Sequence, residues 1–156
     1  MGWLDQLLGK ETRYADADME VVLPGRWRFN RESDHLSFAK ENEQVTVAAY
    51  HSKAPLDMPT LLSAVLDLVR VRQAAIRQLS GPSARLSEID TEYLAGGMNV
   101  GYTATASEEP IQIYSLTLGR PTRVVSFTYN RHTLLAPEPE FLARSAALRA
   151  GLHVRP

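Results

Sequence analysis

Residues 57–79, DMPTLLSAVLDLVRVRQAAIRQL, repeat apolar side chains at helical spacing over many turns and predict one long helix. The expected buried stripe consists of Leu62, Val65, Val69, Ile76 and Leu79, and the polar side consists of Asp67, Arg70, Gln73, Arg77 and Gln78. Arg72 alone interrupts the stripe. Asp57 can cap the first turn, and Gly81 with Pro82 ends the helix. Because a lone amphipathic helix must bury its stripe, and short alternating segments surround it, we expect it to pack on a sheet.

The segments around this helix alternate apolar and polar residues with period two, which is typical of strands. Before the helix they lie at residues 19–24, 27–29, 36–38 and 45–50, with a polar hairpin at residues 40–44. After it they lie at residues 84–94, 98–106, 111–118 and 123–129, joined by glycine-containing loops at residues 95–97 and 119–122. Residues 139–150 predict a C-terminal helix, followed by an extended piece at residues 152–154. We therefore expect an α+β fold. An antiparallel sheet of about six or seven strands, with the strands after the long helix in a meander, is flanked by the long central helix and the C-terminal helix in an α/β/α sandwich-like arrangement.

A short amphipathic helix is predicted at the amino terminus. Trp3, Leu4, Leu7 and Leu8 lie on one side of it, and Gly9 can end it. It could dock on a membrane or on a partner, or it could pack on its own domain. The last interpretation is favoured, because helices that lie on membranes usually carry Lys or Arg on the polar face and this one carries Asp5. We assign residues 1–11 to this helix and residues 12–156 to a single domain.

Composition excludes several classes of function. The chain has 156 residues and a net charge of −1, which argues against strong electrostatic binding to nucleic acid or anionic lipid. It has no cysteine, hence no disulfide, thiolate nucleophile or cysteine metal site. No apolar run approaches the roughly 20 residues that span a bilayer. We expect a cytoplasmic protein.

No catalytic motif is found. The four histidines, His35, His51, His132 and His153, lie far apart, and none belongs to an H-E-x-x-H pattern. No serine lies in a G-x-S-x-G motif, and the glycines form no nucleotide-binding loop. We therefore expect no catalytic residues, no metal and no cofactor, and a protein that is not an enzyme.

Two surfaces are candidates for binding. Arg70 and Arg77 lie two turns apart on the exposed side of the long helix and could receive carboxylates or a phosphate, although a solvated helix face is the commoner meaning of such a pair. The strand at residues 111–118 carries Tyr114 and Leu116 on one side and Ile111 and Ile113 on the other, so it is apolar on both sides. Either helices cover both of its faces, or one face is an open apolar groove.

The order of elements resembles the PsbP-like and DcrB-like superfamily of small bacterial domains. The resemblance is carried by V-L-P-G-R-W at residues 22–27, T-V-A-A at residues 46–49, the helix from Asp57, the hairpin at Gly96 and Gly97, and residues 141–154. It covers about residues 18–156. It implies an antiparallel sheet between helices, in a superfamily that mostly binds other proteins. Some cytoplasmic members look like accessory proteins of toxin-delivery systems that shelter an effector's apolar helices.

We thus expect a non-catalytic cytoplasmic protein-binding module, an immunity protein or a chaperone for a cognate secreted bacterial toxin or effector. It would make no contact with nucleic acid or membrane, and homodimer formation is left open. Its partner-binding residues are expected to be Arg70, Arg77, Tyr114, Leu116, Trp3 and Leu7. The alternative is a small-molecule-binding protein or enzyme with a pocket between helix and sheet, using His51 or His132 with Tyr102, Tyr129 or Arg123. A third hypothesis is membrane association through Trp3, Leu4, Leu7 and Leu8.

Overall fold

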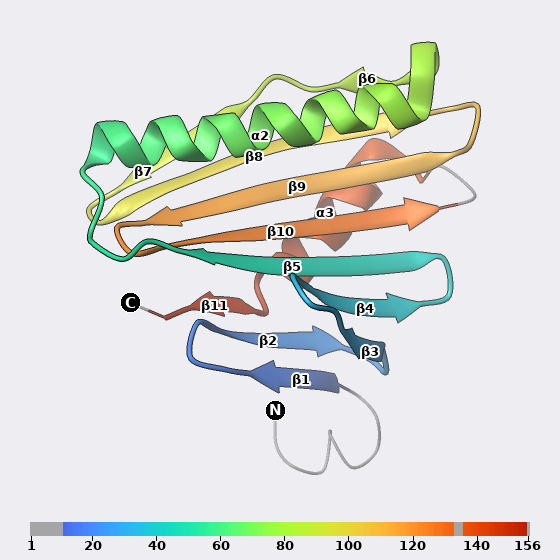
Figure 1. Ribbon diagram of the computed structural model, residues 1–156. Coiled ribbons are helices and arrows are strands. Elements are labelled where there is room, and N and C mark those ends of the chain that lie inside the picture. The colour runs from blue at the N-terminus through green and yellow to red at the C-terminus, as the bar shows by residue number, and fades with distance from the viewer. Residues whose placement is uncertain (1–10, 133–135, 156) are drawn as a thin grey trace.

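A large antiparallel sheet with a long helix along one face dominates the computed structural model, which describes residues 11–132 and 136–155 (Figure 1). The helices are α2 (Met58–Ser80), the short 3-10 helix η1 (Gly81–Ser83) and α3 (Glu138–Arg149). The first strands are β1 (Glu11–Ala15), β2 (Met19–Pro24), β3 (Arg28–Arg31), β4 (Leu36–Lys40) and β5 (Glu43–His51). After α2 come β6 (Arg85–Leu86), β7 (Asp90–Leu94), β8 (Gly97–Ala106), β9 (Ile111–Arg120), β10 (Arg123–His132) and, after α3, β11 (Leu152–Val154). The predicted α+β class, with a large antiparallel sheet and one long helix, is confirmed.

Both ends of α2 follow from local chemistry. The carboxylate of Asp57 accepts a hydrogen bond from the backbone N–H of Thr60 at 2.8 Å, which satisfies one of the free donors of the first turn. At the other end Gly81 adopts a positive φ of 63°, a conformation that glycine reaches without steric cost. The predicted start and end of this helix are confirmed.

The face that α2 buries differs from the predicted stripe. The buried residues are Leu61, Val65, Val69 and Gln73, which lie four apart and follow the contact with β8 and β9. Leu79, predicted in the stripe, is 87% exposed, and Gln73, predicted on the polar side, is only 8% exposed. The prediction was wrong at the start of the helix, where Leu61 is fully buried and Leu62 is not, and at its C-terminal half, because the side chains that meet the sheet follow the i, i+4 row.

The large sheet has the strand order β3-β4-β5-β10-β9-β8-β6, and β7 also pairs with β8. Every pairing is antiparallel, and the hairpins predicted between neighbouring strands are present: β4–β5, β7–β8 and β9–β10. The strands run further into the predicted loops, so that β4 and β5 are joined at Glu41 and Asn42 alone.

The meander predicted for the strands after α2 is present as β7–β8–β9–β10, but the prediction of one sheet was wrong, because β1, β2 and β11 form a second, three-stranded sheet. In its register Leu152 of β11 pairs with Val21 of β2, although 131 positions separate them in the chain. This sheet and α3 lie on the side of the large sheet that faces away from α2 (Figure 1). The core between them is formed by Met19, Val21, Leu23, Trp27, Leu36, Phe38, Val45, Val47, Leu116, Leu118, Val125, Phe127, Tyr129, Phe141, Leu148 and Leu152. Residues 1–10 of the predicted N-terminal helix lie outside the described residues, and its last residue, Glu11, instead begins β1.

An ionic network joins α3 to the sheet. The carboxylate of Glu43 on β5 accepts hydrogen bonds from the Arg144 guanidinium, at 3.0 Å from Nε and 3.1 Å from Nη2, and from the Tyr129 hydroxyl. Burial raises the pKa of Glu43, but the hydrogen bonds from Arg144 and Tyr129 outweigh burial and leave this pKa below its ordinary value. Burial and the neighbouring carboxylate raise the pKa of Tyr129. At neutral pH the network is therefore an ionised carboxylate held by a guanidinium and a neutral phenol.

Strand β9 is buried on both faces, which decides between the two alternatives for residues 111–118. On the α2 side Ile113 is 7% exposed and Thr117 is fully buried, and on the opposite side Leu116 and Leu118 are 5% and 6% exposed. The middle of this strand is therefore covered on both faces, whereas Ile111 and Ile113 at its beginning line the floor of a half-open groove beside α2.

Across residues 11–132 and 136–155, no helix combines the length and the apolar character that crossing a membrane requires.

Candidate functional site

The side of the large sheet that faces α2 is only partly covered, because α2 packs on β8 and β9 at one end of it (Figure 1). Alternate side chains of β10, β5 and β4 point to this side of the sheet. Thr128 on β10 pairs with Thr46 on β5, which pairs with Ser37 on β4, so these three side chains form one row across the strands. We call this surface the open sheet face and define it by Ser37, Ala39, Gln44, Thr46, Ala48, Tyr50, Thr128 and Asn130. None of these residues is charged.

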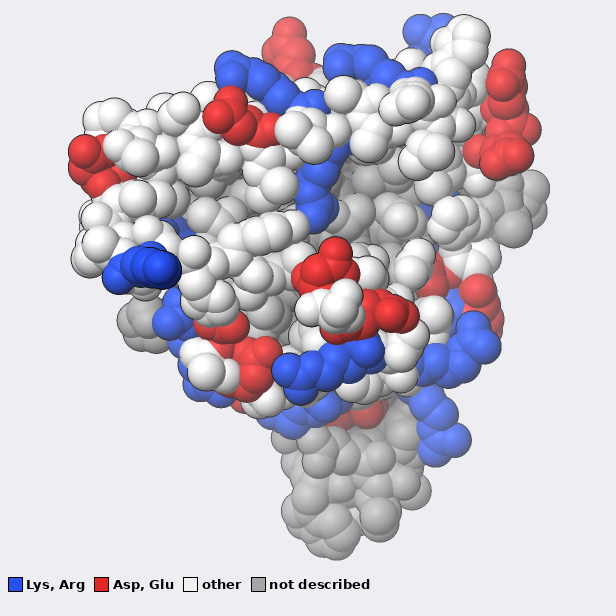
Figure 2. Space-filling model, in the orientation of Figure 1, with Lys and Arg blue, Asp and Glu red and all other residues white. Residues whose placement is uncertain are grey.

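The open sheet face forms an uncharged area between α2 and a margin of charged side chains, as Figure 2 shows in the orientation of Figure 1. Tyr50 is its most prominent side chain and is 44% exposed. Gln44 donates to the Ser37 hydroxyl at 3.0 Å, so neighbouring strands are also joined by side chains here.

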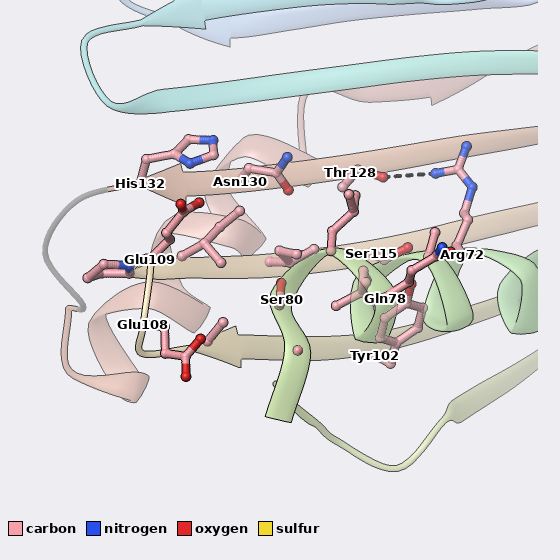
Figure 3. A pocket seen from close by; sticks show the side chains of 18 residues that line it. Arg72, Gln78, Ser80, Tyr102, Glu108, Glu109, Ser115, Thr128, Asn130 and His132 are labelled. Carbon is pink, nitrogen blue, oxygen red and sulfur yellow. Dashed lines mark hydrogen bonds between the residues drawn. The ribbon is translucent and has the colours of Figure 1, made fainter. Parts of the chain in front are cut away.

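A half-open groove of about 680 Å³ adjoins the open sheet face, between the C-terminal half of α2 and strands β8, β9 and β10 (Figure 3). Ile76 and Leu79 of α2 line its helical wall, and Ile111 and Ile113 of β9 line its floor. The row of buried residues on α2 ends at Gln73, but the helix itself continues to Ser80. The groove lies under this last part of the helix.

Polar groups line one side of the groove. Arg72 reaches down from α2 and donates through Nη1 to the Thr128 hydroxyl of β10 at 3.1 Å, and Asn130 and His132 follow along the same strand (Figure 3). The side-chain oxygen of Asn130 is buried and has no hydrogen-bond partner among the described residues. This oxygen is therefore an unpaired acceptor buried beneath the wall of the groove.

Tyr102 of β8 lies at the same end of the groove as Arg72 (Figure 3). Burial raises its pKa, and a hydrogen bond with Ser115 and the charges of Arg72 and Arg77 oppose this shift without cancelling it. The phenol is neutral at physiological pH, so Arg72 has no anionic phenolate beside it.

A second hollow, of about 370 Å³, lies on the other side of the large sheet at β7, β8 and β9. Tyr114 and Leu116 line it with Arg149 at the end of α3 and the carboxylates of Asp90 and Glu92. Burial raises the pKa of Tyr114. The phenol is neutral here as well.

The structure does not bring the predicted partner-binding residues together. Arg70 and Arg77 are exposed on α2, where Arg70 lies 3.5 Å from the Asp67 carboxylate. Tyr114 and Leu116 lie on the opposite side of the sheet, and Leu116 belongs to the core. Trp3 and Leu7 lie outside the described residues. The binding roles of all six stay predictions.

The residues predicted for a small-molecule site are distributed over three places. His132 and Tyr102 line the groove. His51 and Arg123 meet at Asp18, whose carboxylate lies 2.6 Å from His51 Nε2 and 3.5 Å from Arg123 Nη1. Tyr129 lies in the core on the other side of the sheet. Of these five residues, the groove therefore contains two.

Within the described part of the chain, no three His, Asp or Glu side chains gather where they could hold a metal ion.

Two features of this surface were missed in the sequence. The first is the contact of Arg72 with Thr128, and its signal was present, because Arg72 interrupts the apolar stripe of the long helix. The second is the open sheet face, whose signal is a set of Ser, Thr, Gln and Asn residues at alternate positions of neighbouring strands. Only the pairing of β10 with β5 places these residues on one surface.

No protein-family model matches the sequence, and no curated protein matches it. Several solved structures are similar in fold. The solution structure of cyanobacterial PsbP (CyanoP) from Synechocystis sp. PCC 6803 has a TM-score of 0.66 at 14% identity, and the alignment covers 94% of each chain. The predicted PsbP-like fold is confirmed by this likeness, whereas the DcrB-like assignment stays a prediction.

Two further structures are similar at lower scores. The Ran-binding protein Mog1p of Saccharomyces cerevisiae has a TM-score of 0.58 at 10% identity, with 92% of this chain and 95% of Mog1p aligned. A protein of Bacteroides thetaiotaomicron has a TM-score of 0.51 at 13% identity, with 95% of this chain and 49% of the other aligned. At these identities the likeness is one of fold.

Proposed function

We propose that the protein is a non-catalytic protein-binding module that recognises its partner through the open sheet face. The observation that carries this proposal is the uncharged area over β10, β5 and β4 with charged side chains at its margin (Figure 2). Protein interfaces have this layout, with charged residues depleted in the centre and a polar rim around it. Tyr50 is the natural anchor, because exposed tyrosines are enriched among the residues that carry most of the binding energy.

The comparisons support a binding role for this fold. Mog1p, which has the same fold, is a Ran-binding protein. By analogy we propose that this protein also binds a protein partner, and we do not propose that the partner is Ran.

A finer proposal concerns the partner. The resemblance to DcrB-like accessory proteins favours a secreted bacterial toxin or effector, which this protein would either neutralise or escort from the cytoplasm. Arg70 and Arg77 are exposed on α2 and stay candidates for further contacts with such a partner.

The test is affinity capture of the tagged protein from its native cytoplasm, repeated with two arginine variants. Thr46→Arg places a charge in the centre of the open sheet face, and Leu142→Arg places the same charge on α3, where Leu142 is 40% exposed. We expect a stoichiometric partner that Leu142→Arg retains and Thr46→Arg loses, with circular dichroism showing both variants folded. A partner retained by Thr46→Arg would refute the proposed surface.

The captured protein then separates the two finer roles. A partner that arrests growth when expressed alone, and is harmless with this protein, supports immunity. A partner that is harmless alone but is not secreted in the absence of this protein supports escort.

A second candidate function, binding of a small molecule, is favoured by the groove between α2 and the sheet. Its volume of about 680 Å³ lies within the range of small-molecule sites, and its walls combine apolar and polar groups. A ligand that binds there would raise the melting temperature. No stabilisation by any compound of a metabolite screen would remove this candidate.

A further inference from the structure

Arg72 is a half-buried cation whose hydrogen-bonding capacity is mostly unused. Its only partner among the described residues is the Thr128 hydroxyl, whereas a guanidinium has five N–H donors. Two other partly buried arginines meet carboxylates, as Arg144 meets Glu43 and Arg123 meets Asp18, and a third, Arg120, donates to carbonyl and amide oxygens. A partly buried charge without a counter-charge is costly, so the environment of Arg72 favours an anion from outside the chain.

The groove extends from Arg72 along β9 and β10 towards the β8–β9 turn (Figure 3). The four-residue step from Thr128 to His132 on β10 gives it a length of about 13 Å. Along this length Ile113 and then Ile111 form the floor, and Ile76 lines the helical wall. A molecule anchored at Arg72 would thus place an aliphatic chain over an apolar floor.

The far end of the groove has the opposite charge. Glu108 and Glu109 lie there, with His132 at the end of β10 (Figure 3). These carboxylates would repel a second negative group at that distance from Arg72. A ligand with one anionic head and an uncharged tail fits the charge pattern, and a molecule with an acid at each end does not.

We propose that the groove binds an aliphatic monocarboxylate, with its carboxylate on Arg72 and its tail over Ile113 and Ile111. A single guanidinium matches a singly charged carboxylate in a two-pronged hydrogen-bonded pair. This inference names a ligand class for the second candidate function and rests on the groove being a small-molecule site. The protein-partner proposal is independent of it.

The experiment titrates the full-length protein with octanoate by isothermal calorimetry and compares octanamide and octylamine, which have the same chain and an uncharged or positive head. We expect octanoate to bind at least about tenfold more tightly than either, because a charge-assisted pair is worth at least that factor. Equal affinity for the three would overturn the carboxylate assignment and leave a groove that binds aliphatic chains. Failure of all three would overturn the assignment of an aliphatic ligand, whereas the metabolite screen separately decides whether the groove is a small-molecule site.

Two variants and a matched control locate the binding. Arg72→Gln should weaken octanoate about tenfold, whereas Arg70→Gln, on the same helix but exposed beside Asp67, should leave it unchanged. Leu79→Asp, at an 87% exposed position of the helical wall, should weaken octanoate while the melting temperature stays the same. Equal octanoate affinity of Arg72→Gln and the wild type would show that the head group binds elsewhere and would refute the proposal.

Discussion

The replacement Glu43→Gln tests how α3 is held on the large sheet. It removes the negative charge that accepts two hydrogen bonds from Arg144 and one from Tyr129, in a side chain that is only 13% exposed. Hydrogen bonds to a charged group are about twice as strong as neutral ones, but Arg144 is 29% exposed and water can partly replace the lost contacts. We therefore expect a loss of about 2 kcal/mol in the free energy of unfolding at pH 7.

In thermal unfolding this loss corresponds to a fall in melting temperature of about 4–8 °C for a chain of this size. Urea unfolding followed by far-ultraviolet circular dichroism gives the free energy directly. The control is Glu41→Gln, which removes an exposed carboxylate from the adjoining turn and should change the stability by less than about 0.5 kcal/mol.

The effect of Glu43→Gln should depend on pH with a definite sign. Since the folded-state pKa of Glu43 is lowered, its stabilising contribution is complete above the unfolded-state pKa of about 4.3 and is lost as the pH falls through the folded-state value. The wild type and Glu43→Gln should therefore differ at pH 7 and converge in acid. Equal stability at pH 7, or a difference that grows in acid, would refute the assignment of Glu43 as an ionised anchor.

Two further predictions concern the contact of α2 with the sheet. A Cβ atom at Gly119 would lie 2.9 Å from the side chain of Val65, so Gly119→Val should cost about 1–3 kcal/mol in unfolding free energy. The control is Gly96→Val, which should cost far less because no atom lies within 4 Å of a Cβ at Gly96. Equal losses in urea unfolding would show that α2 does not pack closely on β9. Leu61→Ala should lower the unfolding free energy by about 2–5 kcal/mol, because Leu61 is fully buried. Leu79→Ala should lower it by less than about 0.5 kcal/mol, because Leu79 is 87% exposed. A lower melting temperature for Leu79→Ala than for Leu61→Ala would contradict the orientation found for α2.

The features that could be predicted from the sequence are those that neighbouring residues determine. The ends of α2 follow from Asp57 and Gly81, and the hairpins follow from turn residues between alternating strands. Each of these signals acts over a few positions in the chain.

The features that could not be predicted depend on distant residues. The second sheet requires Leu152 to pair with Val21, which no local pattern encodes. Likewise the orientation of α2 is set by β8 and β9, so Gln73 became buried while the more apolar Leu79 remained exposed. Helix periodicity limits which residues share a face, but the position of the sheet decides which face is buried.

The candidate site shows the same division. Arg72 was visible as an irregularity in the stripe, but its partner Thr128 lies 56 positions further along the chain. The open sheet face depends on the pairing of β10 with β5, which are separated by α2 and four strands in the sequence. The sequence therefore indicated the unusual residue and not the surface to which it belongs.

The most direct test of the proposed binding surface is hydroxyl-radical footprinting of the protein with and without its captured partner. Tyr50 on the open sheet face and Phe29 on the opposite side of the sheet are both 44% exposed, so they form a matched pair of aromatic probes. We predict that the partner lowers the labelling of Tyr50 and leaves that of Phe29 unchanged. Protection of Phe29 with unchanged labelling of Tyr50 would contradict the account and move the interface to the other side of the sheet.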